Sequence, residues 1–356
     1  FNGNEFAQHA LDFGCSFVVV DDPSLRVADP RCILVKNSMQ ALQDLAQHHR
    51  MQFDIPVIGL TGSNGKTTTK ELIASVLETE KKVVATEGNL NNHIGVPKTL
   101  LQIRPETEIA VIEMGANHVG EIADLCLITL PTHGVVTNIG RAHLGLFGGY
   151  AGVIKAKTEL YDFIKNHGGE VFVNASDSLL REKTENLKRI MYGPEFKVDP
   201  VVSNKTLPYV SVHWSRTDIQ TQLTGEYNLD NIAAAISVGV YFELQKDNII
   251  KGIEKYEPKN QRSEIIETLR DNLVIKDYYN ANRSSMEKAL QNLHDIAIDK
   301  TKIAILGDMF ELGEFSTDEH RHVMQKAVDS GINEIILIGS EFGELIIEYK
   351  NITQLT

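Results

Sequence analysis

From about residue 54 onward, the sequence alternates short apolar runs with segments whose apolar residues recur at helical spacing. The runs "IPVIGL", "EIAVIEMG" and "HGVVTNIG" have the length and composition of buried strands, and each precedes a helical segment. This alternation predicts an α/β fold with a mostly parallel, doubly wound sheet, whose ligands bind beyond the carboxyl ends of the strands. The loops after the three runs should therefore lie together along one edge of the sheet.

The first of these loops, "TGSNGKTTTK" at residues 61–70, combines glycines, lysines and threonines. It misses the usual phosphate-loop pattern GxxxxGK[ST] by one position, because Leu60 stands where the first glycine belongs. Glycines still allow backbone N–H groups to face an anion, and a helix beginning near Thr67 would direct its positive end there. Lys66 could reach the β- and γ-phosphates of a nucleotide, and Thr67 could bind Mg²⁺. A plain glycine-rich turn is the alternative.

The functional interpretation of three further side chains depends on that loop. Glu113 ends the apolar run "AVIE", and beside a phosphate loop it would be a natural Mg²⁺ ligand. His143 lies in the glycine-rich stretch "NIGRAHLGLFGG", and Lys157 lies in the helical stretch "AGVIKAKTELYDFI". Taken singly, the three would be a surface or capping glutamate, a structural histidine and a solvated lysine.

Asparagines are concentrated in two other segments. The polar stretch "ATEGNLNNHIGVPKTLL" offers Asn89, Asn91, Asn92 and His93 to a polar substrate, with an irregular surface loop as the alternative. The stretch "GEYNLDN" places Asn228 and Asn231 at the start of a helix. They would either recognise the adenine or ribose of a nucleotide or form an ordinary N-cap pair.

Composition narrows the range of partners. With 35 basic and 48 acidic residues, a net charge of −13, the chain is not expected to coat nucleic acid or anionic lipid. No apolar run approaches the ~20 residues needed to cross a bilayer, so no membrane insertion is expected. The three cysteines are far apart and unpaired in pattern, which favours a reducing cytoplasmic location over a disulfide scaffold.

The chain divides into three parts by composition and periodicity. Residues 1–53 contain one strand signal, "SFVVV", and one helix signal, so we expect the remnant of a domain whose beginning is absent. Residues 54–261 carry the βα alternation and a β-ribbon near 205–225, and "YEPKNQR" is a candidate linker. Residues 262–356 resume the alternation as a Rossmann-like domain, whose end we also expect to be missing.

Taken together, these segments resemble the Mur ligases, cytoplasmic ATP-dependent amide-bond ligases of peptidoglycan precursor synthesis. The motifs that carry the resemblance are "TGSNGKTT", "EGNLNNHIGVP", "VIEMGANHVGEI", "TNIGRAHLGLFGG" with "KAKTEL", "GEYNLDNIAAA", "NQRSE", "DYYNANRSSM" and "LGDMFELGE". The resemblance implies a three-domain architecture. Residues 1–53 would belong to the UDP-substrate domain, 54–261 would be the central ATP-binding domain, and 262–356 would be the C-terminal Rossmann-like domain.

The resemblance also implies roles for individual residues. The catalytic set would be Lys66, Glu113, His143 and Lys157. Two Mg²⁺ ions would be held by Thr67, Glu113, His143 and Lys157, the last as a carbamate. ATP would contact Gly62, Ser63, Asn64, Gly65, Lys66, Thr67, Thr68, Asn228, Asn231, Arg262, Asp277, Tyr279 and Asn280. The other substrate would contact Asn89, Asn91, Asn92 and His93.

Within the family, "EMGAN" and "YNANRSSM" are similar to the member that joins D-alanyl-D-alanine to UDP-N-acetylmuramoyl-tripeptide. We expect the chain to be a monomer. The tripeptide carboxylate would form an acyl phosphate, from which the dipeptide amine displaces phosphate. Lys276 and Arg283 depart from the family pattern of an acidic residue and a proline, which leaves the C-terminal nucleotide contacts open. The alternatives are a ligase for another amino acid and a nucleotide-binding module without ligase activity.

Overall fold

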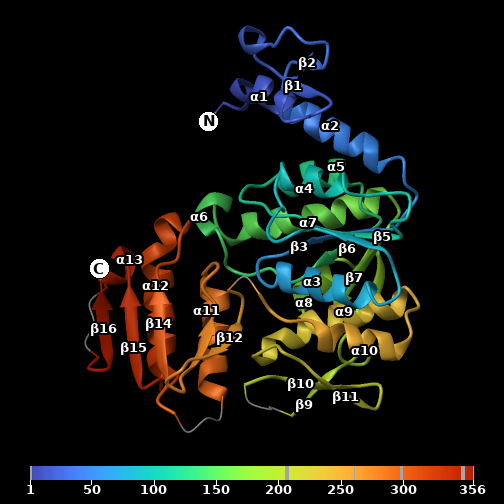
Figure 1. Ribbon diagram of the computed structural model, residues 1–356. Helices are drawn as coiled ribbons and strands as arrows, with labels where there is room; N and C mark the ends of the chain where they lie inside the picture. The colour runs from blue at the N-terminus through green and yellow to red at the C-terminus, as the bar shows by residue number, and fades with distance from the viewer. Residues whose placement is uncertain (1, 205–207, 260, 297–299, 346–348, 356) are drawn as a thin grey trace.

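The computed structural model describes residues 2–204, 208–259, 261–296, 300–345 and 349–355 (Figure 1). Its largest sheet has six parallel strands in the order β4-β5-β3-β6-β7-β8, which confirms the predicted doubly wound α/β fold. These strands are β3 (Val57–Thr61), β4 (Val83–Ala85), β5 (Ile109–Glu113), β6 (His133–Val136), β7 (Glu170–Asn174) and β8 (Lys188–Tyr192).

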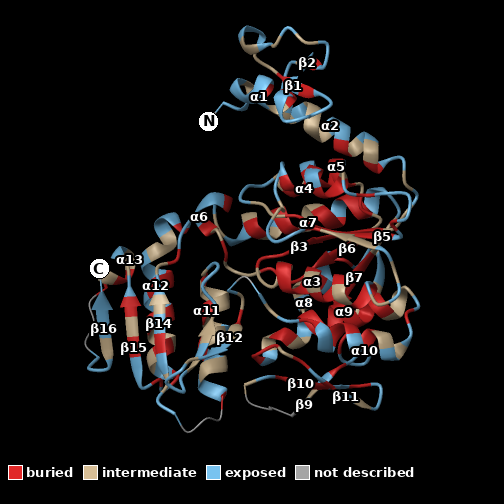
Figure 2. Ribbon diagram, viewed as in Figure 1, coloured by how far each residue is buried: buried red, intermediate tan, exposed pale blue. Residues whose placement is uncertain are grey.

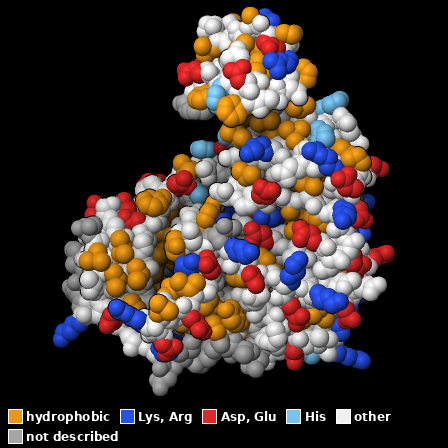
Figure 3. Space-filling model, viewed as in Figure 1, with side chains coloured by type: hydrophobic (Ala, Val, Ile, Leu, Met, Phe, Trp, Pro, Cys, Tyr) orange, Lys and Arg blue, Asp and Glu red, His pale blue; other side chains and the backbone are white. Residues whose placement is uncertain are grey.

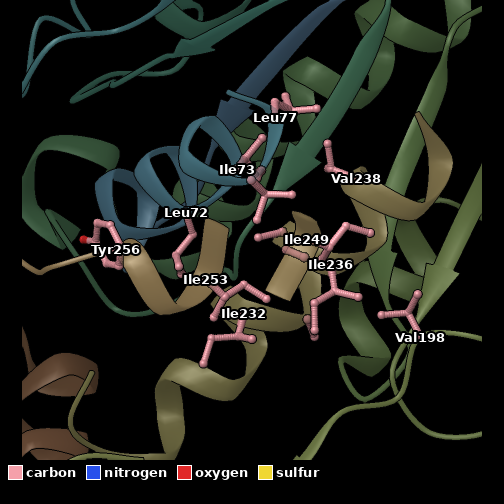
Figure 4. Packing of buried hydrophobic residues seen from close by; sticks show 14 of the residues in the cluster. Leu72, Ile73, Leu77, Val198, Ile232, Ile236, Val238, Ile249, Ile253 and Tyr256 are labelled. Atoms are coloured by element: carbon pink, nitrogen blue, oxygen red, sulfur yellow. The ribbon is translucent and has the colours of Figure 1, made fainter. Parts of the chain in front are cut away.

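Helices cover both faces of this sheet, and buried side chains concentrate there (Figures 1 and 2). One face packs against α3 (Lys66–Leu77), α9 (Leu229–Tyr241) and α10 (Lys246–Lys255), whose side chains interdigitate in Figure 4. The other face packs against α4 (Gly95–Leu100), α5 (Glu121–Thr129) and α7 (Tyr150–Asn166). Strands buried on both faces explain why "VIGLT" and "IAVIE" are apolar along almost their whole length.

The strand order brings three distant loops together. β3 lies between β5 and β6, so the chain continues from β3 to one side of the sheet and later returns to the other. The loops after β3, β5 and β6 leave from the carboxyl ends of these adjacent parallel strands. The third of them contains the short helix α6 (Leu144–Phe147) before α7 begins. An open α/β sheet binds ligands at such a point of reversal.

The elements from the N-terminus to α2 form a small N-terminal unit around a two-stranded parallel sheet. They are η1 (Gly3–Phe6), α1 (Ala7–Asp12), β1 (Val18–Val20), η2 (Pro23–Leu25), β2 (Cys32–Leu34) and α2 (Ser38–Arg50). Only the strand β1 and the helix α2 had clear sequence signals. α2 extends toward the central sheet and packs against α4 and α5 (Figure 1).

The helix α8 (Ser178–Lys183) connects β7 to β8. After β8, the chain forms a three-stranded antiparallel sheet in the order β11-β10-β9. Its strands are β9 (Val201–Asn204), β10 (Ser211–Trp214) and β11 (Thr217–Gln220), with η3 (Glu226–Asn228) leading into α9. The expected ribbon at 205–225 is therefore present but begins earlier, and residues 205–207 lie outside the described residues. The elements from β3 to α10 are called the central unit below.

The elements from β12 onward are called the C-terminal unit. They comprise β12 (Glu264–Glu267), β13 (Leu273–Lys276), α11 (Arg283–Asp295), β14 (Ile303–Gly307), η4 (Gly313–Phe315), α12 (Ser316–Asp329), β15 (Glu334–Ile338), α13 (Ser340–Gly343) and β16 (Ile352–Leu355). β14, β15 and β16 form a parallel sheet, while β12 and β13 form a separate antiparallel pair. The helix expected at "FGELIIEY" is only α13, since the described helix ends at Gly343; residues 346–348 lie outside the described residues.

Among the described residues, no helix has both the length and the apolar character required to cross a membrane.

Candidate active site

A cavity of about 1060 Å³ lies where the central unit meets the C-terminal unit and α2. Figure 3 shows the C-terminal unit on the left, with a hollow between it and the central unit. Of the residues singled out in the sequence, the cavity is lined by Ser63, Asn64, Gly65, Lys66, Thr68, Asn91, Asn92, His93, Glu113, His143, Asn228, Asn231, Arg262, Asp277, Tyr279 and Asn280. Four others, Gly62, Thr67, Asn89 and Lys157, do not line it.

The loop between β3 and α3 has the backbone that a phosphate loop needs. Gly62 and Gly65 have φ of +147° and +76°, and α3 begins at Lys66, immediately after Gly65. The Lys66 Nζ folds back onto the loop and donates to the carbonyl oxygens of Gly62 and Ser63 at 2.9 and 3.1 Å. Removal from water lowers the pKa of Lys66, and the positive charge of Arg262 acts in the same direction. An anion in the cavity would find a helix N-terminus and an ammonium group side by side.

Asn231 supports this loop from behind. A Cβ atom on Gly65 would lie 2.8 Å from the Asn231 Oδ1, which accepts a hydrogen bond from Thr69 Oγ1 at 2.9 Å. The Asn231 Nδ2 donates to Asn228 Oδ1 at 2.8 Å, and Asn228 Nδ2 donates to the Thr224 carbonyl at 2.7 Å. Asn228 occupies the N-cap position of α9, but its side chain makes no capping hydrogen bond, so the two asparagines do not form an ordinary N-cap pair. Their buried amides tie α9 to the loop and to α3.

Glu113 is fully buried at the end of β5, beside α3. Its Oε1 accepts from Asn91 Nδ2 at 2.8 Å and from Thr67 Oγ1 at 3.3 Å. Its Oε2 is buried and finds no hydrogen-bond partner among the described residues. A buried carboxylate oxygen without a partner is costly unless a cation or donor satisfies it, so the position fits a hard cation such as Mg²⁺.

Lys157 projects from α7 toward the loops after β5 and β6. Its side chain is 3% exposed, so it is not a solvated lysine. The Nζ lies 3.4 Å from the Ala116 carbonyl oxygen and 5.2 Å from the centroid of the Phe147 ring. Burial lowers the pKa of Lys157 to about 7, and Lys66 contributes in the same direction. At neutral pH much of the amine is therefore uncharged, the form that can capture CO₂.

His143 has a φ of +55° at the start of α6, and its ring contacts the C-terminal unit. Its Nδ1 pairs with the Glu311 carboxylate, a partner that the sequence did not indicate. Burial lowers the pKa of His143, although Glu311 opposes that shift. A histidine whose Nδ1 is held by a carboxylate presents Nε2 in a fixed direction. Among the described residues, no group of three or more His, Cys, Asp or Glu side chains is placed to hold a metal ion unaided.

The C-terminal unit contributes an aromatic and charged wall. The Arg262 guanidinium stacks over the Tyr279 ring, with its Cζ 3.8 Å from the ring centroid. Its Nε is buried and lacks a partner among the described residues. Asp277 accepts from the Ser263 N–H at 3.2 Å, and burial raises the pKa of this carboxyl. The side chain of Asn280 accepts from the Ala281 N–H at 3.0 Å.

The remaining sequence candidates have local roles. Asn92 Oδ1 accepts from the N–H groups of Ile94 and Gly95, and the His93 carbonyl accepts from Gln43 Nε2. Lys276 pairs with Glu264 across β12 and β13 at 2.8 Å, and Arg283 pairs with Glu287 at 3.1 Å. Both unusual basic residues thus have acidic partners within the C-terminal unit.

Sequence reasoning missed Asn282, which joins the C-terminal unit to the phosphate loop. Its Nδ2 donates to Asn64 Oδ1 at 2.7 Å, while its Oδ1 caps α11 by accepting from the Ser285 N–H at 3.0 Å. The stretch "NRSS" is a sequence signal for the start of a helix, but no sequence pattern indicates that Asn282 contacts Asn64.

Comparisons with known proteins agree with this geometry. The profile of the Mur ligase middle domain matches residues 60–239, about half of the chain, and that of the "Mur ligase, glutamate ligase domain" matches residues 261–351. The UDP-N-acetylmuramoyl-tripeptide–D-alanyl-D-alanine ligase of Bacillus subtilis (strain 168) is 33% identical over 326 residues, which cover 90% of this chain and 71% of that protein.

Two solved structures are similar over nearly the whole chain. MurF from Acinetobacter baumannii has a TM-score of 0.86 and 31% identity, covering 99% of this chain and 79% of that one. The MurF ligase of Thermotoga maritima in complex with ADP has a TM-score of 0.85 and 27% identity, covering 99% and 82%. The phosphate loop, the buried carboxylate beside it and these matches lead to one assignment: the chain belongs to the Mur ligase family.

Proposed function

We propose that this chain is an ATP-dependent ligase that joins D-alanyl-D-alanine to UDP-N-acetylmuramoyl-tripeptide through an amide bond, releasing ADP and phosphate. The observation that carries the proposal is the Glu113 carboxylate, which is buried directly beside the Lys66 loop and has one oxygen without a hydrogen-bond partner in the part of the chain that the structure describes. The similarity to D-alanyl-D-alanine-adding relatives supports the choice of substrates.

ATP is assigned to the cavity between the loop and the C-terminal wall. Its phosphates would lie at the amino end of α3, against the backbone of residues 62–68 and the Lys66 ammonium. The buried amides of Asn228 and Asn231, with Arg262, Asp277, Tyr279 and Asn280, are available to the nucleoside. An adenine or ribose contact would also give the unpartnered Arg262 Nε an acceptor.

The reaction has two covalent steps. A tripeptide carboxylate oxygen attacks the γ-phosphorus of ATP, the bond to the β–γ bridging oxygen breaks, and ADP leaves with that electron pair. The dipeptide amine then attacks the acyl carbon, loses a proton, and the phosphate departs. Lys66 stabilises the negative charge that develops on the transferring group. Contacts from both units exclude water that would hydrolyse the acyl phosphate.

Asn91, Asn92 and His93 border the cavity on the side proposed for the tripeptide, and Asn89 lies beside them in the same segment.

Two Mg²⁺ ions fit this donor set. We propose that Thr67 and Glu113 hold one ion and that His143 and a carbamate on Lys157 hold the second. Bound Mg²⁺ would neutralise phosphate charge and polarise the P–O bonds. Two features support this set: the Glu113 oxygen that has no hydrogen-bond partner among the described residues, and the buried Lys157 amine, whose pKa is lowered to about 7.

We further propose the division into residues 1–53 for the UDP part of the substrate, 54–261 for ATP and 262–356 for closing the site. The ligase would act as a monomer in the cytoplasm, where UDP-activated precursors and ATP are available. Sedimentation at working concentration tests the oligomeric state.

The decisive experiment for the function is mass spectrometry of the product formed from UDP-N-acetylmuramoyl-tripeptide, ATP and D-alanyl-D-alanine. A product heavier by one dipeptide less water, with equimolar phosphate, is expected. The same assay with lysine- and diaminopimelate-containing tripeptides identifies the third residue. ATP binding without phosphate release would instead favour a nucleotide-binding module, and use of another amino acid would move the assignment within the family.

The carbamate has its own test. Lys157→Ala should lose most activity, and a short-chain carboxylic acid should restore part of it by supplying the missing oxygen donors. Lys155→Ala, an exposed position on the same helix, is the matched control and should behave as wild type. Full activity of Lys157→Ala would contradict the carbamate.

A further inference from the structure

The loop between β6 and α7, residues 137–149, is held by the C-terminal unit at several separate points. The Arg141 N–H donates to Ser284 Oγ at 3.1 Å, and the Gly145 N–H donates to the Glu311 carbonyl at 3.1 Å. A Cβ on Gly145 would lie 2.9 Å from the backbone nitrogen of Gly313, so the two segments are in close contact. This loop carries His143, whose ring also pairs with Glu311.

The strongest of these contacts joins Arg141 to Glu319, in the first turn of α12. The Glu319 Oε1 accepts from Arg141 Nη2 at 2.7 Å and from Arg141 Nε at 3.0 Å. Arg283 Nη1 lies 3.6 Å from the same oxygen. The Glu319 side chain is 3% exposed, and its Oε2 is buried without a partner among the described residues.

A carboxylate so deeply buried depends on its cations. Removing one partner of a buried ion pair leaves an uncompensated charge, which is strongly unfavourable. Arg283 belongs to the C-terminal unit and is shared with Glu287, at 3.1 Å. Arg141 belongs to the central unit and makes both short contacts to Glu319. The pairing of Glu319 is therefore complete only while the two units are docked.

We propose that Glu319 is a positioning residue that acts through Arg141. It fixes the loop 137–149, and with it His143, against the C-terminal unit, so that the arrangement of the cavity wall depends on docking. Arg141 stands two residues before His143, so a displaced Arg141 backbone would carry the imidazole with it. The kinetic part of this inference rests on the proposed ligase function; the structural part does not.

The structural test is hydrogen exchange on the complete chain. In Glu319→Gln the charge is lost but the shape is kept, and peptides covering 137–149 should exchange on the order of tenfold faster. Peptides from β14 and β15 should be unchanged, which separates loss of docking from unfolding. Asp318→Asn is the matched control, since Asp318 is 86% exposed and pairs with Arg321 on its own helix. Unchanged exchange at 137–149 in Glu319→Gln overturns the proposal.

The kinetic test uses a double-mutant cycle. Glu319→Gln and Arg141→Gln should each lower kcat by about 10- to 100-fold with a smaller change in KM, because misplacement affects the reacting geometry more than binding. The double variant should be no worse than about threefold below the poorer single variant, because both remove the same contact. Multiplying effects would show that Glu319 only stabilises its own unit, and would overturn the proposal.

Arg141→Gln also keeps the test decisive if Glu319→Gln fails to fold, because Arg141 is 40% exposed and its loss leaves Glu319 with Arg283. It should give the same faster exchange at 137–149. A wild-type chain that makes no product would count against the proposed function alone, since the exchange comparison requires no turnover.

Discussion

Lys66 and Lys157 belong to different elements, yet the charge of Lys66 affects the pKa of Lys157. Burial is the main cause of the lowered pKa in both, and the charge of Lys66 lowers the pKa of Lys157 further. Lys66 has two carbonyl acceptors and a nearby carboxylate, Glu113, to support its charge. Lys157 has one distant carbonyl and an aromatic ring. The two lysines therefore lie in different environments, and the charge of Lys66 adds to the burial that lowers the pKa of Lys157 to about 7.

The protonation of Lys157 should be visible in the pH dependence of stability. Its pKa is about 7 in the folded chain and about 10.4 when unfolded. Between these values the unfolded chain binds the extra proton, so the free energy of unfolding should rise with pH. Relative to Lys157→Met, the wild type should gain up to about 1.4 kcal/mol per pH unit between pH 7.5 and 9.5. Urea unfolding in CO₂-free buffer measures this, and parallel curves for the two proteins would contradict the buried neutral amine.

Replacement of Lys66 tests the phosphate loop directly. Lys66→Ala should lower turnover by several orders of magnitude, since its ammonium is assigned to charge that builds up in phosphoryl transfer. The fold should survive because the side chain lines a cavity and does not pack in the hydrophobic core. Phosphate release and thermal unfolding should be measured together, with Lys155→Ala as the control. Near-normal release by the folded variant would contradict the assigned role.

The neighbouring sequence predicted the position of some site residues but not of others. Lys66 and Glu113 follow strands whose apolar character was plain, and parallel strands bring their carboxyl ends to one edge. Glu311, Glu319 and Asn282 act through partners about 168 to 218 positions away. No local pattern encodes such pairs, because they depend on how the C-terminal unit docks. Lys157 appeared solvated by default, and only the packing of α7 shows it buried.

At the scale of elements, the loop from β3 to α3 depends on its glycines. Gly65→Ala would put a Cβ at a φ of +76° and 2.8 Å from Asn231 Oδ1. Gly168 has a φ of +72° with open space around it, so Gly168→Ala carries the same backbone strain without the collision. Both variants should lose about 1 kcal/mol of stability or somewhat more. Only Gly65→Ala should also lose nucleotide affinity, by about tenfold or more, in an ADP titration. Equal ADP affinities in the two variants would mean that the contact with Asn231 is unimportant for binding.

The longer helices and the strands of the six-stranded sheet followed their hydrophobic periods closely, whereas several short elements did not. α4 and α13 are only six and four residues long, too short for a periodic pattern to establish. β1 and β2 contain three residues each. Such elements are set by tertiary packing, which explains why the sequence predicted a loop where α4 begins and a longer helix where α13 ends.

For the whole molecule, the proposed chemistry depends on three units meeting at one cavity. The central unit supplies the loop and Glu113, and the C-terminal unit supplies Arg262 and the side chains that hold His143 in place. α2 adds the amide groups of Gln40, Gln43 and Gln47 to the lining. The sequence predicted the sheet edge, but the width and polarity of the cavity follow from docking, which periodicity does not describe.

The polar character of this cavity leads to a prediction about the acceptor. Many of its lining groups are amides and charged side chains, so a bound dipeptide can pair its own amide and its terminal carboxylate with them. Free D-alanine would leave the groups that meet the second residue unpaired, and such discrimination reaches about 10⁴-fold in polar pockets. We therefore expect kcat/KM for D-alanyl-D-alanine to exceed that for D-alanine or L-glutamate by about 10⁴-fold or more in a phosphate-release assay with the tripeptide substrate. A dipeptide amidated at its carboxyl end should also be a poor acceptor, because it keeps the shape and loses the charge. Comparable rates with a single amino acid would exclude a dipeptide-specific site and favour another member of the family.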